Sequence, residues 1–203
     1  MSSLDNFSNL LMKYRELKEL LIKNRSYRRF KQSEKISDNE LQEIVELATL
    51  CASGRNLQPL KYKLVNNDAI CAALFKQLSW AGYLTDWTGP EEGERPVAYI
   101  VQCLDESLTK NPLCDEGLQL EVLTLGATAK GYGTCIIKSF NVSKVRELLE
   151  LSPFLTPAYI VALGIPVEEV VLERIVDDDV KYWRDERGIH HVPKRGVEEI
   201  LVK

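Results

Sequence analysis

The stretch "VAYIVQCL" at residues 97–104 decides the class of fold. A second run of the same kind, "AYIVALG", occupies residues 158–164. Neither run alternates apolar and polar residues, as a strand with one face in water would. Both are therefore predicted to be central strands covered on both faces, and helices must flank the sheet that they form.

The surrounding sequence supplies those helices. Apolar residues recur at helical spacing over 8–23, from Ser37 to just before Gly54, and over about 68–78, 115–130 and 142–150. Ser37 and Glu40 form a capping-box signature at the start of the second helix. Shorter strands are expected at 62–66 and within 131–140. Side chains expected in the core are Leu41, Ile44, Val45, Ala48, Cys51, Ile70, Leu74 and Leu78.

Two segments lack this periodicity. Residues 79–96, "SWAGYLTDWTGPEEGERP", mix aromatic residues with glycine, proline and acid, which favours a long surface loop or a lid. The charged tail, 167–203, is predicted to offer little core and to wrap over a surface or a partner subunit. No repeat or linker interrupts the chain, so residues 1–203 are predicted to form a single domain.

Composition excludes several classes of protein. With 45% hydrophobic residues and a net charge of -4, the chain has ordinary globular composition and no basic excess for coating nucleic acid. Charges interrupt the first 24 residues, so we expect neither a signal peptide nor a membrane span, and a cytoplasmic protein. The five cysteines are well separated, so we expect neither a disulfide framework nor a structural zinc. The two histidines, His190 and His191, are adjacent, so we expect neither a metal site nor a histidine base.

The segment "NRSYRRF" at 24–30 is a dense basic run in this acidic chain. Arginine forms paired, charge-assisted hydrogen bonds with phosphate, and a serine hydroxyl adds a compact donor. Arg25, Ser26 and Arg28 are therefore candidate anion ligands. The alternative is a solvated basic turn between two helices.

Polar residues also follow the second helix in "ASGRNLQP", 52–59. Ser53, Asn56 and Gln58 carry groups that can read the polar edge of a planar ring. The alternative is a helix end at Gly54 followed by a turn. A second cationic pair, Lys194 and Arg195, is either exposed tail or a further clamp on the anion bound by Arg25 and Arg28. The glycines of "GYGTCIIK", 131–138, precede a strand and do not follow one, which excludes a Rossmann dinucleotide motif.

In their order along the chain, "RSYRRF", "ASGRNLQPLKYKLV", "DEGLQLEVLTLGATAKGYGTC", "YIVALGIP" and "KRGVEEI" resemble the nitroreductase family of oxidoreductases that depend on flavin mononucleotide (FMN). The resemblance covers about residues 20–200. It implies an α+β fold with a mixed, mostly antiparallel sheet flanked by helices. It also implies an intertwined homodimer with flavin sites at the subunit interface.

The resemblance assigns cofactor-binding residues one motif at a time. Arg25, Ser26 and Arg28 match the motif that holds the flavin phosphate and the pyrimidine edge, and Lys194 and Arg195 match a basic pair that joins the phosphate site. Ser53, Asn56 and Gln58 match a segment beside the ring, supplied in part by the partner subunit. The stretch that lies against the ring corresponds to Ile137, Lys138 and Ser139.

The function implied is transfer of electrons from NADH or NADPH through FMN to a small nitroaromatic, quinone or flavin acceptor, in a ping-pong sequence. The flavin carries the chemistry, so no catalytic side chain and no metal are expected. Leu60, Lys61, Arg55 and the Lys138–Ser139 pair depart from the family pattern, which leaves open a specialised flavin enzyme, such as a reductive dehalogenase or a flavin-fragmenting enzyme. A second alternative is a non-enzymatic module that binds acidic lipid or RNA.

Overall fold

The core of the molecule is a four-stranded antiparallel sheet in the order β1-β2-β4-β3. The computed structural model describes residues 3–202, with side chains from Leu10 onward. The strands are β1 (Leu60–Val65), β2 (Ala98–Asp105), β3 (Gly133–Ile137) and β4 (Leu155–Gly164). The two apolar runs are thus the central strands β2 and β4, as predicted.

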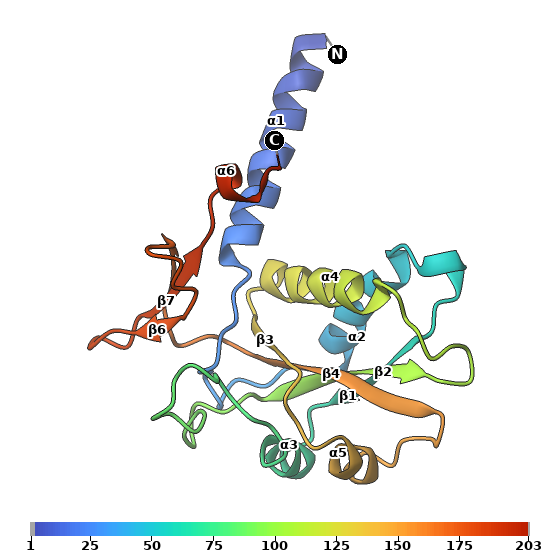
Figure 1. Ribbon diagram of the computed structural model, residues 1–203. Helices are drawn as coiled ribbons and strands as arrows, with labels where there is room; N and C mark the ends of the chain where they lie inside the picture. Colours follow the sequence, from blue (N-terminus) through green and yellow to red (C-terminus); the bar gives the residue numbers. More distant parts are fainter. Residues whose placement is uncertain (1–2, 203) are drawn as a thin grey trace.

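Helices cover both faces of this sheet (Figure 1). On one face, α3 (Asp68–Phe75) and α5 (Val142–Leu148) pack against Tyr99 and Val101 of β2. On the other face, α2 (Asp38–Glu46) and α4 (Asp115–Ala129) pack against Ala98 and Ile100. Successive residues of a strand point to opposite faces, so a strand between two helical layers must be apolar throughout.

The helix predictions hold with two local corrections. The capping box of Ser37 and Glu40 is confirmed, but α2 gives way to two 3₁₀ turns, η1 (Leu47–Leu50) and η2 (Gly54–Asn56). The prediction that Ile70 is buried is wrong: it is 37% exposed, whereas Cys71 and Leu74 are buried. The short α3 turns its Cys71–Leu74 side to the sheet, which leaves Ile70 at the edge.

The first helix, α1 (Ser3–Lys23), leaves the body of the protein and touches it through its last turns, near α4 (Figure 1). Its apolar stripe is not buried within this chain: Leu10, Tyr14 and Leu17 are 58%, 66% and 49% exposed. The predicted amphipathic pattern is present, but its apolar side faces solvent in the single chain.

The C-terminal segment contains more structure than its charge suggested. It forms a second sheet from β5 (Val170–Arg174), β6 (Trp183–Arg184) and β7 (His190–Lys194), with β7 in the middle, followed by α6 (Val197–Ile200). The expectation of little core is confirmed, because no described residue after Pro166 belongs to either hydrophobic cluster of the core; His190, at 1% exposed, is a buried polar residue. Most of the strand pairs in the two sheets are antiparallel, and the α+β class is confirmed.

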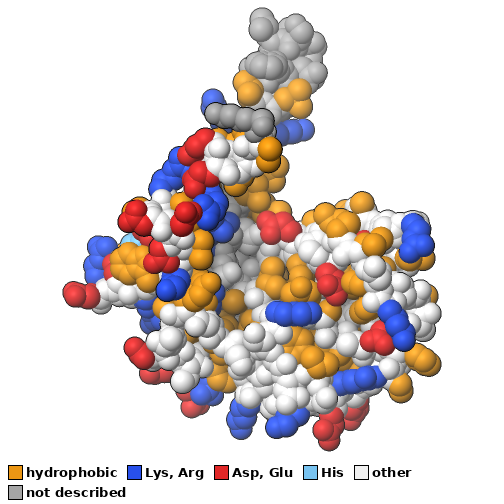
Figure 2. Space-filling view, viewed as in Figure 1, with side chains coloured by type: hydrophobic (Ala, Val, Ile, Leu, Met, Phe, Trp, Pro, Cys, Tyr) orange, Lys and Arg blue, Asp and Glu red, His pale blue; other side chains and the backbone are white. Residues whose placement is uncertain are grey.

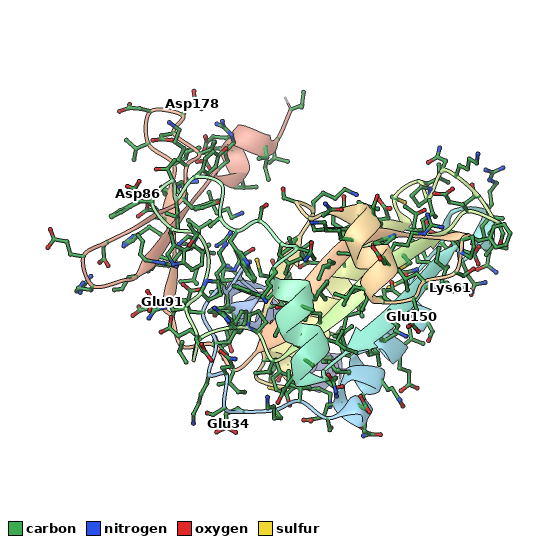
Figure 3. The ribbon with its side chains drawn as sticks, turned by 90° about the horizontal axis from the view of Figure 1, so that it is seen from below. Glu34, Lys61, Asp86, Glu91, Glu150 and Asp178 are labelled. Atoms are coloured by element: carbon green, nitrogen blue, oxygen red, sulfur yellow. The ribbon has the colours of Figure 1, made fainter. Side chains whose placement is uncertain are left out.

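Residues 79–96 contain no helix or strand, as predicted. This loop reaches the C-terminal sheet, where the ring of Tyr83 lies 4.9 Å from that of Tyr182 between centroids. Seen from below, Asp86 of the loop lies on the same side of the molecule as Asp178, away from Lys61 and Glu150 (Figure 3). None of the described helices is both long and apolar enough to cross a membrane.

Candidate functional site

The basic segment 24–30 runs as extended chain between α1 and α2 along the edge strand β3. Ser26 pairs with Thr134 as an isolated parallel bridge, and the amide of Tyr27 donates to the carbonyl of Thr134 over 2.8 Å. The Asn24 amide donates to Thr124 Oγ1 of α4 at 2.9 Å. These bonds fix the segment against the sheet and α4, so its arginines are not a loose surface turn.

A pocket of about 300 Å³ opens beside this segment. Glu121 and Thr124 of α4 form one wall of the pocket, and the C-terminal sheet forms the other. The surface of the molecule is hollowed between them (Figure 2). The cationic or hydroxyl side chains that line it are Arg25, Ser26, Arg28, Thr124, Thr134, Tyr182 and Lys194. Three cationic residues from two distant parts of the chain, the segment 24–30 and the strand β7, therefore meet in one cavity.

Arg28 is held in place on several sides and is only 8% exposed. Its Nη1 donates to the carbonyl of Ser26 at 3.1 Å and lies 3.0 Å from Nε2 of His190. Its guanidinium lies 4.8 Å from the centre of the Tyr182 ring, a cation–π arrangement. The orientation of this cation is thus set by the C-terminal segment.

Glu168 fixes the backbone of the same motif. Its carboxylate, whose side chain is fully buried, accepts from the backbone amides of Arg28 and Arg29 and from Arg184 at 2.9 Å. Arg29 itself turns away to an ion pair with Glu94 at 2.6 Å. One buried carboxylate therefore joins the basic segment to the C-terminal sheet.

Arg25 is anchored differently. Its Nη2 donates to the carbonyl of Leu21 in the last turn of α1 at 2.7 Å, where a cation complements the helix dipole. Its Nε is buried and has no hydrogen-bond partner among the described residues. Burial lowers the pKa of Arg25, although an arginine keeps its charge at neutral pH. Arg25 therefore brings a charged guanidinium to the pocket, with a buried Nε that is unpaired among the described residues.

His190 is a residue of this pocket that the sequence reasoning missed. Burial first, then the neighbouring charges of Arg28, Arg184 and His191, lowers its pKa to about 4, so it is neutral at pH 7. Successive side chains of a strand point to opposite faces, so of the adjacent pair His190 and His191 only His190 lines the pocket. The strand alternation of "HHVPK" was the available signal.

The protein should lose stability as the pH falls, in part because of His190. Its pKa falls from 6.5 to about 4 on folding. Between those values the unfolded chain binds a proton that the folded chain does not, so the free energy of unfolding decreases as pH is lowered through this window. Urea unfolding at several pH values should show a weaker dependence for His190→Gln than for wild type and His191→Gln. Equal slopes in all three would contradict the assignment.

The predicted pair Lys194 and Arg195 separates in the structure. Lys194 lines the pocket, whereas Arg195 donates to Asp178 at 2.7 Å and to Glu199 at 3.3 Å. Neighbouring residues at the end of β7 point to opposite sides, and the acidic partners hold Arg195 away from Arg28. Only one of the two basic residues reaches the pocket within this chain.

A smaller hollow of about 170 Å³ adjoins the first and shares Arg28, Ile136 and Tyr182 with it. Its other walls are the turn Ser79–Gly82 and the end of β3 with Ile137, Lys138 and Ser139. The Lys138 ammonium is engaged by the carbonyl of Ala158 at 2.8 Å. The two hollows lie next to one another along the edge strand β3, and together they form the groove considered below.

Loop 52–58 lies apart from this groove, and none of Ser53, Asn56 and Gln58 lines it. Ser53 Oγ donates to Asp115 of α4 at 2.6 Å, and the amide of Gln58 donates to Ser53 Oγ at 2.9 Å. Asn56 and Gln58 have positive φ angles of 55° and 50°. This sharply turned loop is fixed to the start of α4, and the single chain does not bring it together with Arg28.

The main groove carries no metal-binding signature. Across the part of the chain that the structure describes, no three His, Cys, Asp or Glu side chains cluster closely enough to hold a metal ion. The donors in the pocket are guanidinium, ammonium, hydroxyl and imidazole groups, which suit an anion with several oxygens.

Comparison with known proteins identifies the family. The model of the nitroreductase family matches residues 21–91 and 105–165. The chain belongs to the nitroreductase family. The match includes the basic segment, loop 52–58 and β3, and ends before the C-terminal segment that supplies Glu168, Tyr182, His190 and Lys194.

Individual nitroreductase relatives are distant. YodC of Bacillus subtilis (strain 168), which bears the name of an NAD(P)H nitroreductase, is 26% identical over 163 residues, covering 66% of this chain and 81% of its own. A nitroreductase family protein of Streptococcus pneumoniae TIGR4 aligns with a TM-score of 0.67 and 19% identity, over 92% of this chain and 99% of that one. One from Clostridium novyi NT gives 0.61 and 22%, over 90% and 97%. These structures show that the chain has the nitroreductase fold.

Proposed function

We propose that this protein is an FMN-dependent oxidoreductase that takes electrons from NADH or NADPH and passes them to a small acceptor, such as a nitroaromatic, a quinone or a free flavin. The observation that carries the proposal is the convergence of Arg25, Arg28 and Lys194 on one pocket in a chain of the nitroreductase family. The order of events proposed is ping-pong, with the oxidised nicotinamide leaving before the acceptor binds.

The residues of the groove fit FMN. Its phosphate is a dianion with three acceptor oxygens, and the pocket offers it the cations of Arg25, Arg28 and Lys194 together with the Ser26 hydroxyl. The unpartnered Nε of Arg25 is a further donor. The adjoining hollow, at the end of β3, offers the stretch Ile137–Ser139 to the ring system.

The bound flavin would supply the hydride chemistry, and the side chains of the protein would hold and orient it. Arg25, Arg28, Ser26 and Lys194 would bind the phosphate, and Ile137, Lys138 and Ser139 would border the ring. Because Arg28 is already fixed by its neighbours, little side-chain freedom would be lost on binding.

A homodimer is part of the proposal. Ser53, Asn56 and Gln58 would reach a flavin from the partner subunit, since their own chain places them away from its groove. The exposed apolar stripe of α1 and the segment 167–203 would contribute to the contact between subunits, with residues 1–203 forming one domain. Arg195 would join the phosphate site only after leaving Asp178 and Glu199.

The visible spectrum of the purified protein tests the proposal. We expect oxidised-flavin absorbance, either as isolated or after adding FMN, bleaching with NADH or NADPH in the absence of oxygen, and recovery on adding a quinone or a nitroaromatic. Bleaching by one nicotinamide and not the other would identify the donor. A colourless protein that does not bind added FMN would remove the proposal.

A specialised flavin enzyme is the second candidate, favoured by the position of loop 79–96. The turn Ser79–Gly82 lines the smaller hollow, and Tyr83 packs on Tyr182 beside it. Trp80 belongs to the core at 8% exposed, and Trp87 packs on Arg184, so these two are not free to close over a substrate. Turnover confined to one acceptor, for example a halogenated aromatic or reduced flavin itself, would favour this candidate.

A further inference from the structure

His190 lines the pocket and contacts Arg28, the most deeply buried of its three cations. Its ring lies 5.2 Å from the ring of Tyr182, and the same tyrosine ring lies 4.8 Å from the guanidinium of Arg28. His190 Nε2 is 3.0 Å from Arg28 Nη1, and the histidine is 1% exposed. No part of the family match extends to this residue.

The contact with Arg28 determines the tautomer of His190. A guanidinium has five N–H donors and no acceptor, so His190 Nε2 must be the accepting nitrogen of a neutral ring. The proton of the neutral ring is then on Nδ1. That Nδ1 is buried and has no hydrogen-bond partner among the described residues, which is a costly state for a polar group in a finished site.

We propose that His190 is a positioning residue of this pocket: as a neutral acceptor it aims Arg28, and its Nδ1–H serves as a donor to the bound anion. The inference rests on the proposed function, because the anion it assigns is the phosphate of FMN. The Tyr182 ring contacts both groups: it is tilted by 47° from the imidazole plane and lies against the guanidinium of Arg28. The phosphate would then have a ligand from the C-terminal sheet that is uncharged and distinct from the basic pair Lys194 and Arg195.

The charges around His190 agree with this role. Arg28 and Arg184 both lie close enough to disfavour a second positive charge on the imidazole. The buried carboxylate of Glu168 is already bonded to Arg184 and to the amides of Arg28 and Arg29. A protonated His190 would have no acceptor nitrogen left and would lose its bond to Arg28.

Imidazole ¹⁵N NMR of the wild-type protein tests the tautomer directly. With two histidines in the chain, the His191→Gln variant assigns the signals. We expect a neutral His190 ring protonated on Nδ1 at neutral pH, and a shift of the Nδ1 resonance when FMN is added. A ring protonated on Nε2, a charged ring at neutral pH, or a bound state that leaves Nδ1 unchanged would each overturn the inference.

Binding of FMN to matched variants tests the role in recognition. His190→Leu removes both contacts and should weaken FMN binding by roughly tenfold or more, the loss expected for a hydrogen bond to a charged group. His190→Gln keeps an acceptor for Arg28 and should restore part of the affinity. His191→Gln is the control, because that ring stacks on Trp183 and contacts Glu173 outside the pocket.

The outcomes separate the two proposals. If the wild-type protein does not bind FMN, the proposed function fails, while the NMR tautomer of the free protein still decides whether His190 holds Arg28. If the wild type binds FMN and folded His190→Leu binds it equally well, the proposed function stands and the role of His190 is lost.

Discussion

Replacing Glu168 with alanine should destabilise the folded protein by about 3–5 kcal/mol, the cost of removing one partner from a buried charge pair. The Glu168 side chain is fully buried and accepts from two consecutive backbone amides and from Arg184, whose own side chain is 17% exposed. Without the carboxylate, those donors and the arginine charge remain buried and unpaired. The basic segment would also lose its connection to the C-terminal sheet.

Urea unfolding followed by tryptophan fluorescence measures this effect, with Glu198→Gln as the matched control. Glu198 also pairs with an arginine, Arg174, but both side chains are more than half exposed, at 59% and 64%. Exposed pairs contribute at most about 1 kcal/mol. If Glu168→Ala costs no more than Glu198→Gln, Glu168 does not anchor the motif. A Glu168→Gln variant, which keeps an acceptor for the amides, should lose less than the alanine variant.

The main sheet was predictable because the residue types within each strand and helix indicate it without reference to distant parts of the chain. Strands β2 and β4 are covered on both faces, so their apolar runs have no polar alternation, and helices with regular apolar spacing must surround them. The capping box at Ser37 is equally local, because its two bonds join residues three apart. Features of this kind depend on near neighbours in the sequence and are recognisable without the fold.

The C-terminal sheet was not predictable in the same way. The buried residue at the start of β7 is a histidine, and it packs on Arg28, 162 residues away in the sequence. Hydrophobic periodicity has no signal for a strand whose inner side is polar and whose partners come from the other end of the chain. Composition therefore described this segment as a charged tail.

The residues of the candidate site also fall into those that the sequence could predict and those that it could not. Arg25, Ser26 and Arg28 were singled out by residue type, and the structure places all three on one pocket with Lys194. Sequence spacing alone could not show that Arg195 would pair with Asp178, or that Asp115 would hold loop 52–58 at the start of α4. Whether that loop and Arg195 reach a flavin depends on a second subunit and stays a prediction.

The Arg28→Ala variant should bind FMN more weakly by about 1–3 kcal/mol, or roughly 5- to 150-fold in Kd, through loss of a charge-assisted bond to the phosphate. The larger end of the range is expected here, because Arg28 is held by Ser26, His190 and Tyr182 before any ligand binds. A pre-oriented cation gives up little conformational entropy on binding, so its removal forfeits most of the interaction.

Arg29→Ala provides the matched control for Arg28→Ala. It removes the same charge from the adjacent position, but the Arg29 guanidinium is paired with Glu94 and does not line the pocket. Titration of each variant with FMN, followed by flavin fluorescence, should give a weakened Kd for Arg28→Ala and a Kd close to wild type for Arg29→Ala. Equal losses in the two variants would mean that the pocket responds only to net charge. Wild-type affinity in folded Arg28→Ala would mean that Arg28 does not bind the phosphate, and would place the phosphate elsewhere.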